Sequence, residues 1–361
     1  MENTSNRLIS LDALRGFTIA LMILVNDPGD WGNVYWPLLH AKWHGITITD
    51  FVFPFFVFIV GVSVVLATKN QLAKGVEKST LRKKVVFRSI KIFALGLFLA
   101  LFPEFDFANI RIPGVLQRIA IVYAVCGLMF LSTDWKAQFR TALVLLVGYY
   151  LLMMLVPVPD VGAGVLEPGQ NLAAWIDSLL VPGRLYQVTW DPEGLLSTLP
   201  AIATGISGML AGYMIISIED QHKKVMWMMV VGFVCVLIGY LWHVAFPINK
   251  NLWSSSYVMF TSGWAFMALA TSILFIDVLG YRKGIKFGII YGSNAITIYV
   301  LAGILPNLTS RLLGLQGAFM DGLTGIGLEA KFVSMLWAIL FVLICYIPAY
   351  IMYKKKIFIK V

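Results

Sequence analysis

The run TITDFVFPFFVFIVGVSVVLAT, residues 47–68, contains a single charged side chain, Asp50, close to its start. An α-helix rises 1.5 Å per residue, so a helix over this run would be ~33 Å long, enough to cross the ~30 Å hydrocarbon core of a bilayer. Uninterrupted apolar runs of this length are typical of transmembrane segments. The sequence therefore predicts a membrane-spanning helix here.

Other runs of similar length and polarity are distributed along the whole chain. They predict an all-α fold, a polytopic membrane helical bundle with about ten transmembrane helices, an eleventh being left open. We expect the run nearest the N-terminus, 9–26, to be retained rather than cleaved as a signal peptide, because no small-residue cleavage site follows it. The predicted spans are 9–26, 47–68, 85–102, 113–131, 141–158, 195–216, 225–246, 255–278, 287–305 and 332–353.

The overall composition agrees with a membrane protein. Of 361 residues, 59% are hydrophobic and 13% are charged, whereas soluble chains carry about 25% charged residues. The net charge of +9 comes from basic residues placed between apolar runs, which disfavours a nucleic-acid partner because such proteins gather Lys and Arg on one face. Three cysteines lie inside apolar runs without the spacing of a disulfide framework or a zinc site, so we predict no metal.

The distribution of basic residues predicts the orientation. Segment 69–91 is rich in Lys and Arg, and loops of this kind stay on the cytoplasmic side. Counting spans from there places both termini in the cytoplasm and the loops 27–46 and 159–194 outside. The basic segment itself has a second interpretation, a site for a nucleotide or an acidic lipid. No internal repeat is visible, so 1–361 is predicted to be a single transmembrane domain with an outer cap loop at about 159–194.

Polar residues at the outer ends of spans are costly in lipid and mark a candidate site. His40 is a candidate base because imidazole titrates near neutral pH, the alternative being a hydrogen-bonded anchor. Asp50 needs a partner where it opens an apolar span, the alternative being a helix N-cap. His44 lies four residues after His40, so the two could share a metal on a helix, but no HExxH glutamate is present.

Two arginines flank the turn in RIPGVLQR, residues 111–118. Arg118 falls inside a predicted span, where a guanidinium would suit a phosphate or a carboxylate, whereas Arg111 could simply snorkel to the headgroups. Asp191 and Glu193 precede a helical run, where capping is the alternative to binding.

Lys250 and Trp253 could pair with a phosphate and stack on a ring, or anchor the interface. Asn26 and Asn294 are either site residues or polar contacts between helices.

Taken together, these pieces resemble the heparan-α-glucosaminide N-acetyltransferase family of membrane acetyltransferases and its bacterial relatives. The resemblance begins at Arg7 and covers nearly the whole chain, with the motifs in the family's order. They are LDALRG, VND, HAKWHG, TDFVFPFFVFIVG, RIPGVLQR, DPEG, INKNLWSSSY and GSNAITIY.

The resemblance implies an acetyltransferase that uses cytoplasmic acetyl-CoA as donor and acetylates the amine of an amino sugar on the outer face. By position, His40 corresponds to the active-site histidine and Asn26 to its paired asparagine, with Asp50 as a third catalytic residue. The family's Trp-Asn-Gly is here Trp43-His44-Gly45, and we expect no counterpart of the large lumenal domain of the animal enzyme. The segments also imply cofactor-binding roles for Arg111, Arg118, Lys250, Trp253 and Asn294, and substrate-binding roles for Trp43, His44, Asp191 and Glu193.

Alternatives remain at this point. The chain could be an O-acyltransferase of a surface glycan, or a sugar transporter with His40 and Asp50 as a proton relay. The acetyl group could pass directly to the acceptor or through an acetyl-His40 intermediate. We expect a multi-pass protein of the bacterial cytoplasmic (inner) membrane, with the lipid bilayer and an amino sugar or glycan as partners and a homodimer left open.

Overall fold

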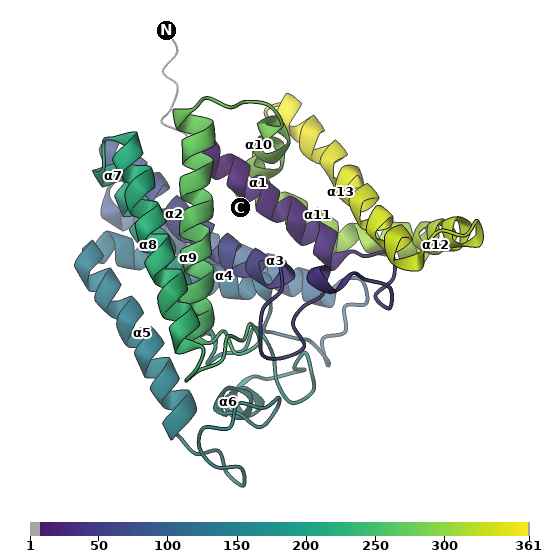
Figure 1. Ribbon diagram of the computed structural model, residues 1–361, viewed down its shortest axis with the longest axis horizontal. Coiled ribbons are helices and arrows are strands. Elements are labelled where there is room, and N and C mark those ends of the chain that lie inside the picture. Colours follow the sequence, from purple (N-terminus) through teal and green to yellow (C-terminus); the bar gives the residue numbers. More distant parts are fainter. Residues whose placement is uncertain (1–7, 360–361) are drawn as a thin grey trace. The chain divides into compact units, whose positions relative to one another are not determined.

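The computed structural model describes residues 8–359, and this part of the chain is helical, without a β-strand (Figure 1). Nine described helices are long and apolar enough to cross a membrane, which confirms a multi-pass membrane protein. The helices are α1 (Ile9–Asn26), α2 (Val52–Ala73), α3 (Lys78–Leu101), α4 (Val115–Ser132), α5 (Trp135–Leu155), α6 (Leu172–Leu180), α7 (Thr198–Ser217), α8 (Gln221–Trp242), α9 (Ser255–Ser272), α10 (Ile285–Ser293), α11 (Ala295–Pro306), α12 (Leu315–Gly325) and α13 (Ala330–Lys354).

Two predicted spans differ from this set. The third, 85–102, lies within α3, whose first half carries so many Lys and Arg residues that α3 is not among the nine. The ninth, 287–305, is interrupted at Asn294, which leaves helical geometry with φ −131° and ψ 42°. The break has a local cause, because the Asn294 side chain bonds the backbone of the C-terminal segment: Nδ2 donates to the Ile357 carbonyl and Oδ1 accepts from the Ile359 N–H, both at 2.9 Å.

The chain divides into two compact units. The first contains the chain up to His40, Thr47–Val52 and everything from Ala268 onward. The second contains Ala41–Ile46 and Phe53–Met267.

In the first unit, α1 and α10 lie side by side with their backbones in contact (Figure 1). Glycines make this possible: a Cβ on Gly16 would lie 1.7 Å from the Gly288 carbonyl oxygen, and a Cβ on Gly292 would lie 2.1 Å from the Asp12 carbonyl oxygen. Close approach at small residues is a common way for helices to associate in membranes.

A Gly16→Ala substitution should therefore force α1 and α10 apart. We expect the free energy of unfolding to fall by about 3 kcal/mol, because the atom in the way belongs to the backbone and cannot rotate aside. Gly317→Ala in α12 is the matched control, since its added Cβ would meet nothing within 4 Å and should stabilise the helix by about 0.5–1 kcal/mol. Thermal unfolding in detergent measures both, and equal melting temperatures for the two variants would contradict the assignment.

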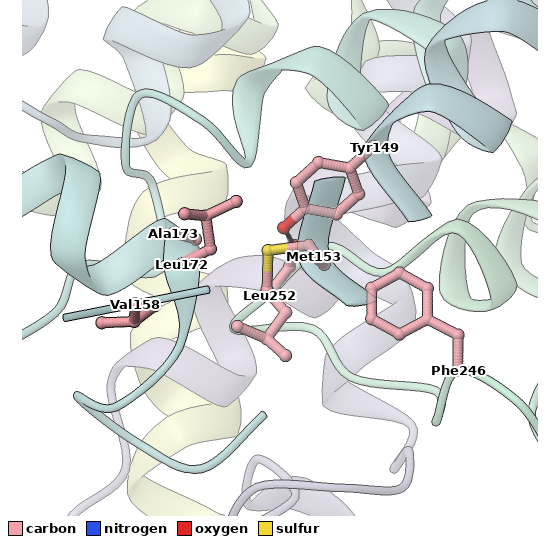
Figure 2. Close-up of a cluster of buried hydrophobic side chains, with 7 residues drawn as sticks. All are labelled: Tyr149, Met153, Val158, Leu172, Ala173, Phe246 and Leu252. Carbon is pink, nitrogen blue, oxygen red and sulfur yellow. Dashed lines mark hydrogen bonds between the residues drawn. The ribbon is translucent and has the colours of Figure 1, made fainter. Parts of the chain in front are cut away.

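The second unit uses the same device between α2 and α7. A Cβ on Gly61 would lie 1.9 Å from the Gly205 carbonyl oxygen, and one on Gly208 would lie 2.0 Å from that of Phe58. An apolar cluster that includes two side chains of α5 fixes the loop before α9 (Figure 2). Its Tyr149 hydroxyl donates to the Leu252 carbonyl at 2.6 Å. The cluster consists of Tyr149, Met153, Val158, Leu172, Ala173, Phe246 and Leu252.

Candidate functional site

His40 and Asp50 are joined by a hydrogen bond in the first unit. His40 Nδ1 lies 2.7 Å from Asp50 Oδ1, and the carboxylate is 1% exposed while the imidazole is 46% exposed. A carboxylate only accepts, so Nδ1 carries the proton of this bond and Nε2 carries the ring's lone pair. The sequence predicted that Asp50 needs a partner, which could be an imidazole, an Arg or a Lys, and in the structure this partner is His40, with the acid buried and the imidazole accessible. This arrangement suits a general base.

Thr47 holds the second oxygen of Asp50. Its N–H donates to Asp50 Oδ2 at 2.9 Å, and its hydroxyl lies 3.0 Å from the same oxygen. The hydroxyl also lies 2.6 Å from the carbonyl of Leu39, the residue before His40. Thr47 therefore connects the carboxylate to the backbone that carries the imidazole. The sequence analysis missed this residue, although its place three positions before Asp50, at the end of a loop, is typical of such local bonds.

Asn26 is the last residue of α1, and its side chain is exposed. The next residue, Asp27, was not predicted as a site residue, yet burial raises the pKa of its carboxyl to about 7. Asp27 follows the helix C-terminus, where the helix dipole further disfavours a negative charge. A carboxyl group that titrates near neutral pH therefore lies next to Asn26.

Asn294 lies at the other end of the first unit. Its neighbour Gly292 packs on Asp12, near the start of α1, whereas Asn26 ends that helix ~21 Å further along its axis. The structure thus separates Asn294 from Asn26, and its amide groups are bonded to the C-terminal segment. A cofactor-binding role for Asn294 stays a prediction, and the described contacts are those of a residue that joins two segments of the fold.

In the second unit, His44 has a different environment from His40. Asn249 Oδ1 accepts from the Leu252 N–H, so its Nδ2 is the donor to His44 Nδ1, at 3.3 Å. The imidazole accepts at Nδ1 and carries its hydrogen on Nε2. Burial lowers the pKa of His44, Glu167 opposes that change and His243 adds to it. The structure thus favours a neutral His44 with its hydrogen on Nε2, whereas the contact with Asp50 places a hydrogen on Nδ1 of His40.

Trp43 is fixed on the outer cap loop. Its indole N–H donates to the Leu166 carbonyl at 2.9 Å, and its ring meets Trp190 edge to face at 5.0 Å between centroids. The two indoles bring the loop of residues 41–46 and the WDPEG segment together. Both rings are half-buried, which leaves part of each surface accessible. A substrate-binding role for Trp43 and His44 stays a prediction.

Arg111 is bonded to both acids of the WDPEG segment. Its Nε and Nη2 grip Asp191 at 2.8 and 2.7 Å, and Nη2 also lies 2.5 Å from Glu193. Burial alone would lower the pKa of Arg111, but these acids more than offset it and hold the pKa above its usual range. The alternative interpretation, in which Asp191 and Glu193 cap the helix that follows them, is wrong. That helix, α7, begins at Thr198, and Ser197 occupies its cap position. Ligand binding by the three stays a prediction.

Arg118 is a buried charge in the second unit. It lies in the first turns of α4 and is 1% exposed. Nη2 donates to the Gly194 carbonyl at 3.0 Å and to the Ser197 hydroxyl at 2.5 Å, and the guanidinium lies over the Trp253 ring at 5.0 Å. Within the described residues, its Nε and Nη1 have no hydrogen-bond partner. Buried donors of this kind require an acceptor.

Trp253 itself is fully buried and held by its neighbours. Its indole N–H donates to Thr204 at 3.0 Å, and its ring packs edge to face on Phe53 and Tyr257. Lys250 supplies the carbonyl that accepts the Trp253 N–H. Lys250 and Trp253 are therefore close to each other because a backbone turn joins them. The Arg118 guanidinium lies over a face of the Trp253 ring. Their cofactor-binding roles stay predictions.

Asp177, on α6, is a buried acid that the sequence analysis did not identify. Its Oδ1 accepts from the Leu195 N–H at 2.7 Å, next to the residues that bind Arg118. Burial raises the pKa of Asp177 to about 6, and both the Leu195 bond and Arg118 oppose the rise. Because its carboxyl pKa is raised, the contribution of Asp177 to stability is greatest below pH ~4 and is lost as the pH rises through about 6.

Asp177→Asn should abolish this loss of stability at higher pH. The amide oxygen can still accept from Leu195, and no charge forms, so we expect the variant to be more stable than the parent by about 2 kcal/mol at pH 8 and equal to it at pH 4. Melting temperatures at both pH values measure this, with Asp160→Asn on the exposed surface as control. A variant that is destabilised equally at both pH values would show that the raised pKa does not govern stability.

No metal-binding group of three or more His, Cys, Asp or Glu occurs among residues 8–359. A cavity of about 780 Å³ between α5, α7, α8 and α9 is lined by apolar side chains almost throughout. Chemistry-bearing groups are therefore found in the two clusters above: His40, Asp50 and Thr47 in the first unit, and Arg111, Arg118, Asp177, Asp191 and Glu193 in the second.

Residues 7–244 match the family model described as heparan-alpha-glucosaminide N-acetyltransferase, catalytic. The chain belongs to this family. Over 422 aligned positions it is 30% identical to the heparan-alpha-glucosaminide N-acetyltransferase of Mus musculus, covering 100% of this chain and 61% of the relative. The enzyme of that name from Homo sapiens is 31% identical, covering 98% and 60%. The chain thus spans about three fifths of the length of these relatives. The matched family region includes both clusters.

Proposed function

We propose that this chain is a membrane-embedded acetyltransferase that moves an acetyl group from acetyl-CoA to the amine of an amino sugar at the outer face of a bacterial inner membrane. Family membership and the transmembrane helices support this proposal. The observation that carries it is the His40–Asp50 pair, in which a buried carboxylate orients an accessible imidazole.

The chemistry requires a base because only an uncharged amine attacks a thioester carbonyl. His40 Nε2 removes the proton from the acceptor nitrogen while the C–N bond forms, and Asp50 stabilises the resulting imidazolium. When the C–S bond breaks, the proton passes from Nε2 to the departing sulfur. Asn26, at the end of α1, is the proposed donor to the carbonyl oxygen as its negative charge develops. We propose direct transfer to the acceptor rather than an acetyl-His40 intermediate, because direct transfer needs the imidazole only as a base.

The experiment that tests this function is mass analysis of products from purified protein, acetyl-CoA and a panel of amino sugars. An N-acetylated sugar formed together with free CoA supports the proposal. An O-acetylated product would support the glycan O-acyltransferase, and no product with any acceptor would overturn the proposal.

The direct route has a separate test. Rapid mixing with labelled acetyl-CoA in the absence of acceptor should release no CoA. Stoichiometric release of CoA with label retained on His40 would instead establish the acetyl-histidine route.

Thr47 should affect catalysis through its hydroxyl. Thr47→Val keeps the side-chain shape and the N–H bond but removes the hydroxyl contact with Asp50 and Leu39, so we expect kcat to fall about 10-fold with KM for both substrates unchanged. Thr47→Ser retains the hydroxyl and should restore most of kcat. Steady-state kinetics decide this, and equal losses in the Val and Ser variants would indicate that the methyl group matters instead.

A further inference from the structure

The contacts of Arg118 restrict which ligand atoms it can bind. A guanidinium grips a phosphate or a carboxylate through two parallel N–H bonds, either from Nε and Nη2 or from Nη1 and Nη2. Both edges include Nη2. In this structure Nη2 already donates to Gly194 and Ser197, which accounts for both of its hydrogens. Neither edge is therefore available for a two-bond grip on an anion.

The donors that remain point in different directions. Nε and Nη1 are buried without a partner in the described part of the chain, and they lie on opposite sides of the guanidinium. Nε has one N–H and Nη1 has two, and no two of these three hydrogens point in the same direction. Trp253 covers a face of the group, so acceptors approach in the guanidinium plane. The arrangement suits two separate single acceptors.

The charge around Arg118 also disfavours an anion. Arg111 and Arg118 share the second-unit cluster with three acids, Asp191, Glu193 and Asp177. Arg111 is already paired with the first two, and Asp177 is largely ionised at pH 7 because its pKa is about 6. A phosphate would add charge to a buried cluster in which carboxyls already outnumber guanidiniums. A neutral oxygen satisfies the same donors without this cost.

We propose that Arg118 binds neutral carbonyl oxygens of the acyl donor, the amide and thioester carbonyls of its pantetheine arm, and does not bind its phosphates. This inference rests on the proposed function, because it assumes an acyl-CoA donor. It assigns Arg118 a role that differs from the phosphate binding expected of an arginine in a nucleotide-dependent enzyme. Arg118 then holds the reacting arm at a depth where phosphates would be too costly to bury.

The test compares acetyl-CoA with S-acetylpantetheine, which has the same arm and thioester but no phosphate. Arg118→Met should raise KM for both donors by a similar factor, about 10- to 100-fold, and leave KM for the sugar unchanged. Arg184→Met, at an exposed arginine of the cap loop, should leave all three unchanged. A loss confined to acetyl-CoA would identify a phosphate contact, and a loss confined to the sugar would identify an acceptor contact; either result overturns the proposal.

A second measurement uses the unmodified protein, in case Arg118→Met fails to fold. S-ethyl-CoA replaces the thioester by a thioether and so lacks the carbonyl oxygen, while all phosphates remain. Calorimetry should show about 10-fold weaker binding of S-ethyl-CoA than of acetyl-CoA. Equal affinities would overturn the proposal. If the unmodified protein binds neither acetyl-CoA nor S-acetylpantetheine, the proposed function fails, and this outcome is distinct from binding that is independent of the carbonyl.

Discussion

His40→Ala is expected to lower kcat for acetyl transfer by about 10²- to 10⁴-fold, the range that a positioned general base contributes. The reason is specific to the geometry: Nδ1 is held by a carboxylate that is 1% exposed, and alanine leaves no group to take the amine proton. Acetyl-CoA binding should be largely retained, because the donors assigned to the arm belong to Arg118. Turnover and calorimetry on the same preparation separate the two effects.

The matched control is His222→Ala. His222 lies exposed in the first turn of α8 and is assigned no role, so its loss should leave kcat and acetyl-CoA affinity unchanged. The pH dependence adds a second check, because a base with imidazole character gives a rate that falls as the pH drops below its pKa. Near-normal turnover in His40→Ala would exclude His40 as the base and leave Asp27, whose pKa is raised to about 7, as the group to examine.

The sequence predicted features that depend on local pattern. Apolar runs located the spans because a helix must be about as long as the bilayer is thick. A partner for Asp50 was also predictable, since a carboxylate at the start of an apolar span needs one, although only the structure shows that this partner is His40, ten residues away. Thr47 lies between these two residues in the sequence. Its position indicates a local hydrogen bond of its hydroxyl, but less clearly than Asp50 indicates the need for a partner. These inferences needed only short separations along the chain.

Contacts between distant segments could not be predicted in this way. Arg111 binds acids 80 and 82 residues later in the chain, and from sequence those acids looked like caps for the helix that follows them. No local sequence pattern distinguishes the glycines at the contact between α1 and α10 from other glycines. Only the fold shows that each faces a backbone oxygen. Asp177 occupies one turn of a short helix in the cap loop, where an acid normally faces water. Its burial arises from packing that no local pattern encodes.

Arg111→Met should be the most destabilising single substitution in the second unit. It removes the only guanidinium bonded to Asp191 and Glu193 in the described part of the chain, and those side chains are 0% and 8% exposed. Breaking a buried ion pair by removing one partner typically costs about 3–5 kcal/mol, because the remaining charge is left without compensation. We therefore expect the free energy of unfolding to fall by about 3–5 kcal/mol at pH 7, measured by thermal unfolding in detergent.

The pH dependence distinguishes loss of charge pairing from loss of packing. Without Arg111, the two buried carboxylates have no cation to offset the cost of burying their charge, so the folded state of the variant is favoured when they are protonated. The difference in stability between parent and variant should therefore be small near pH 4 and widen as the pH rises to 8. A deficit that is constant with pH would instead arise from the lost contact between Arg111 and the Tyr186 ring. Adding Asp191→Asn and Glu193→Gln to Arg111→Met should recover stability at pH 8, because the repelling charges are then absent.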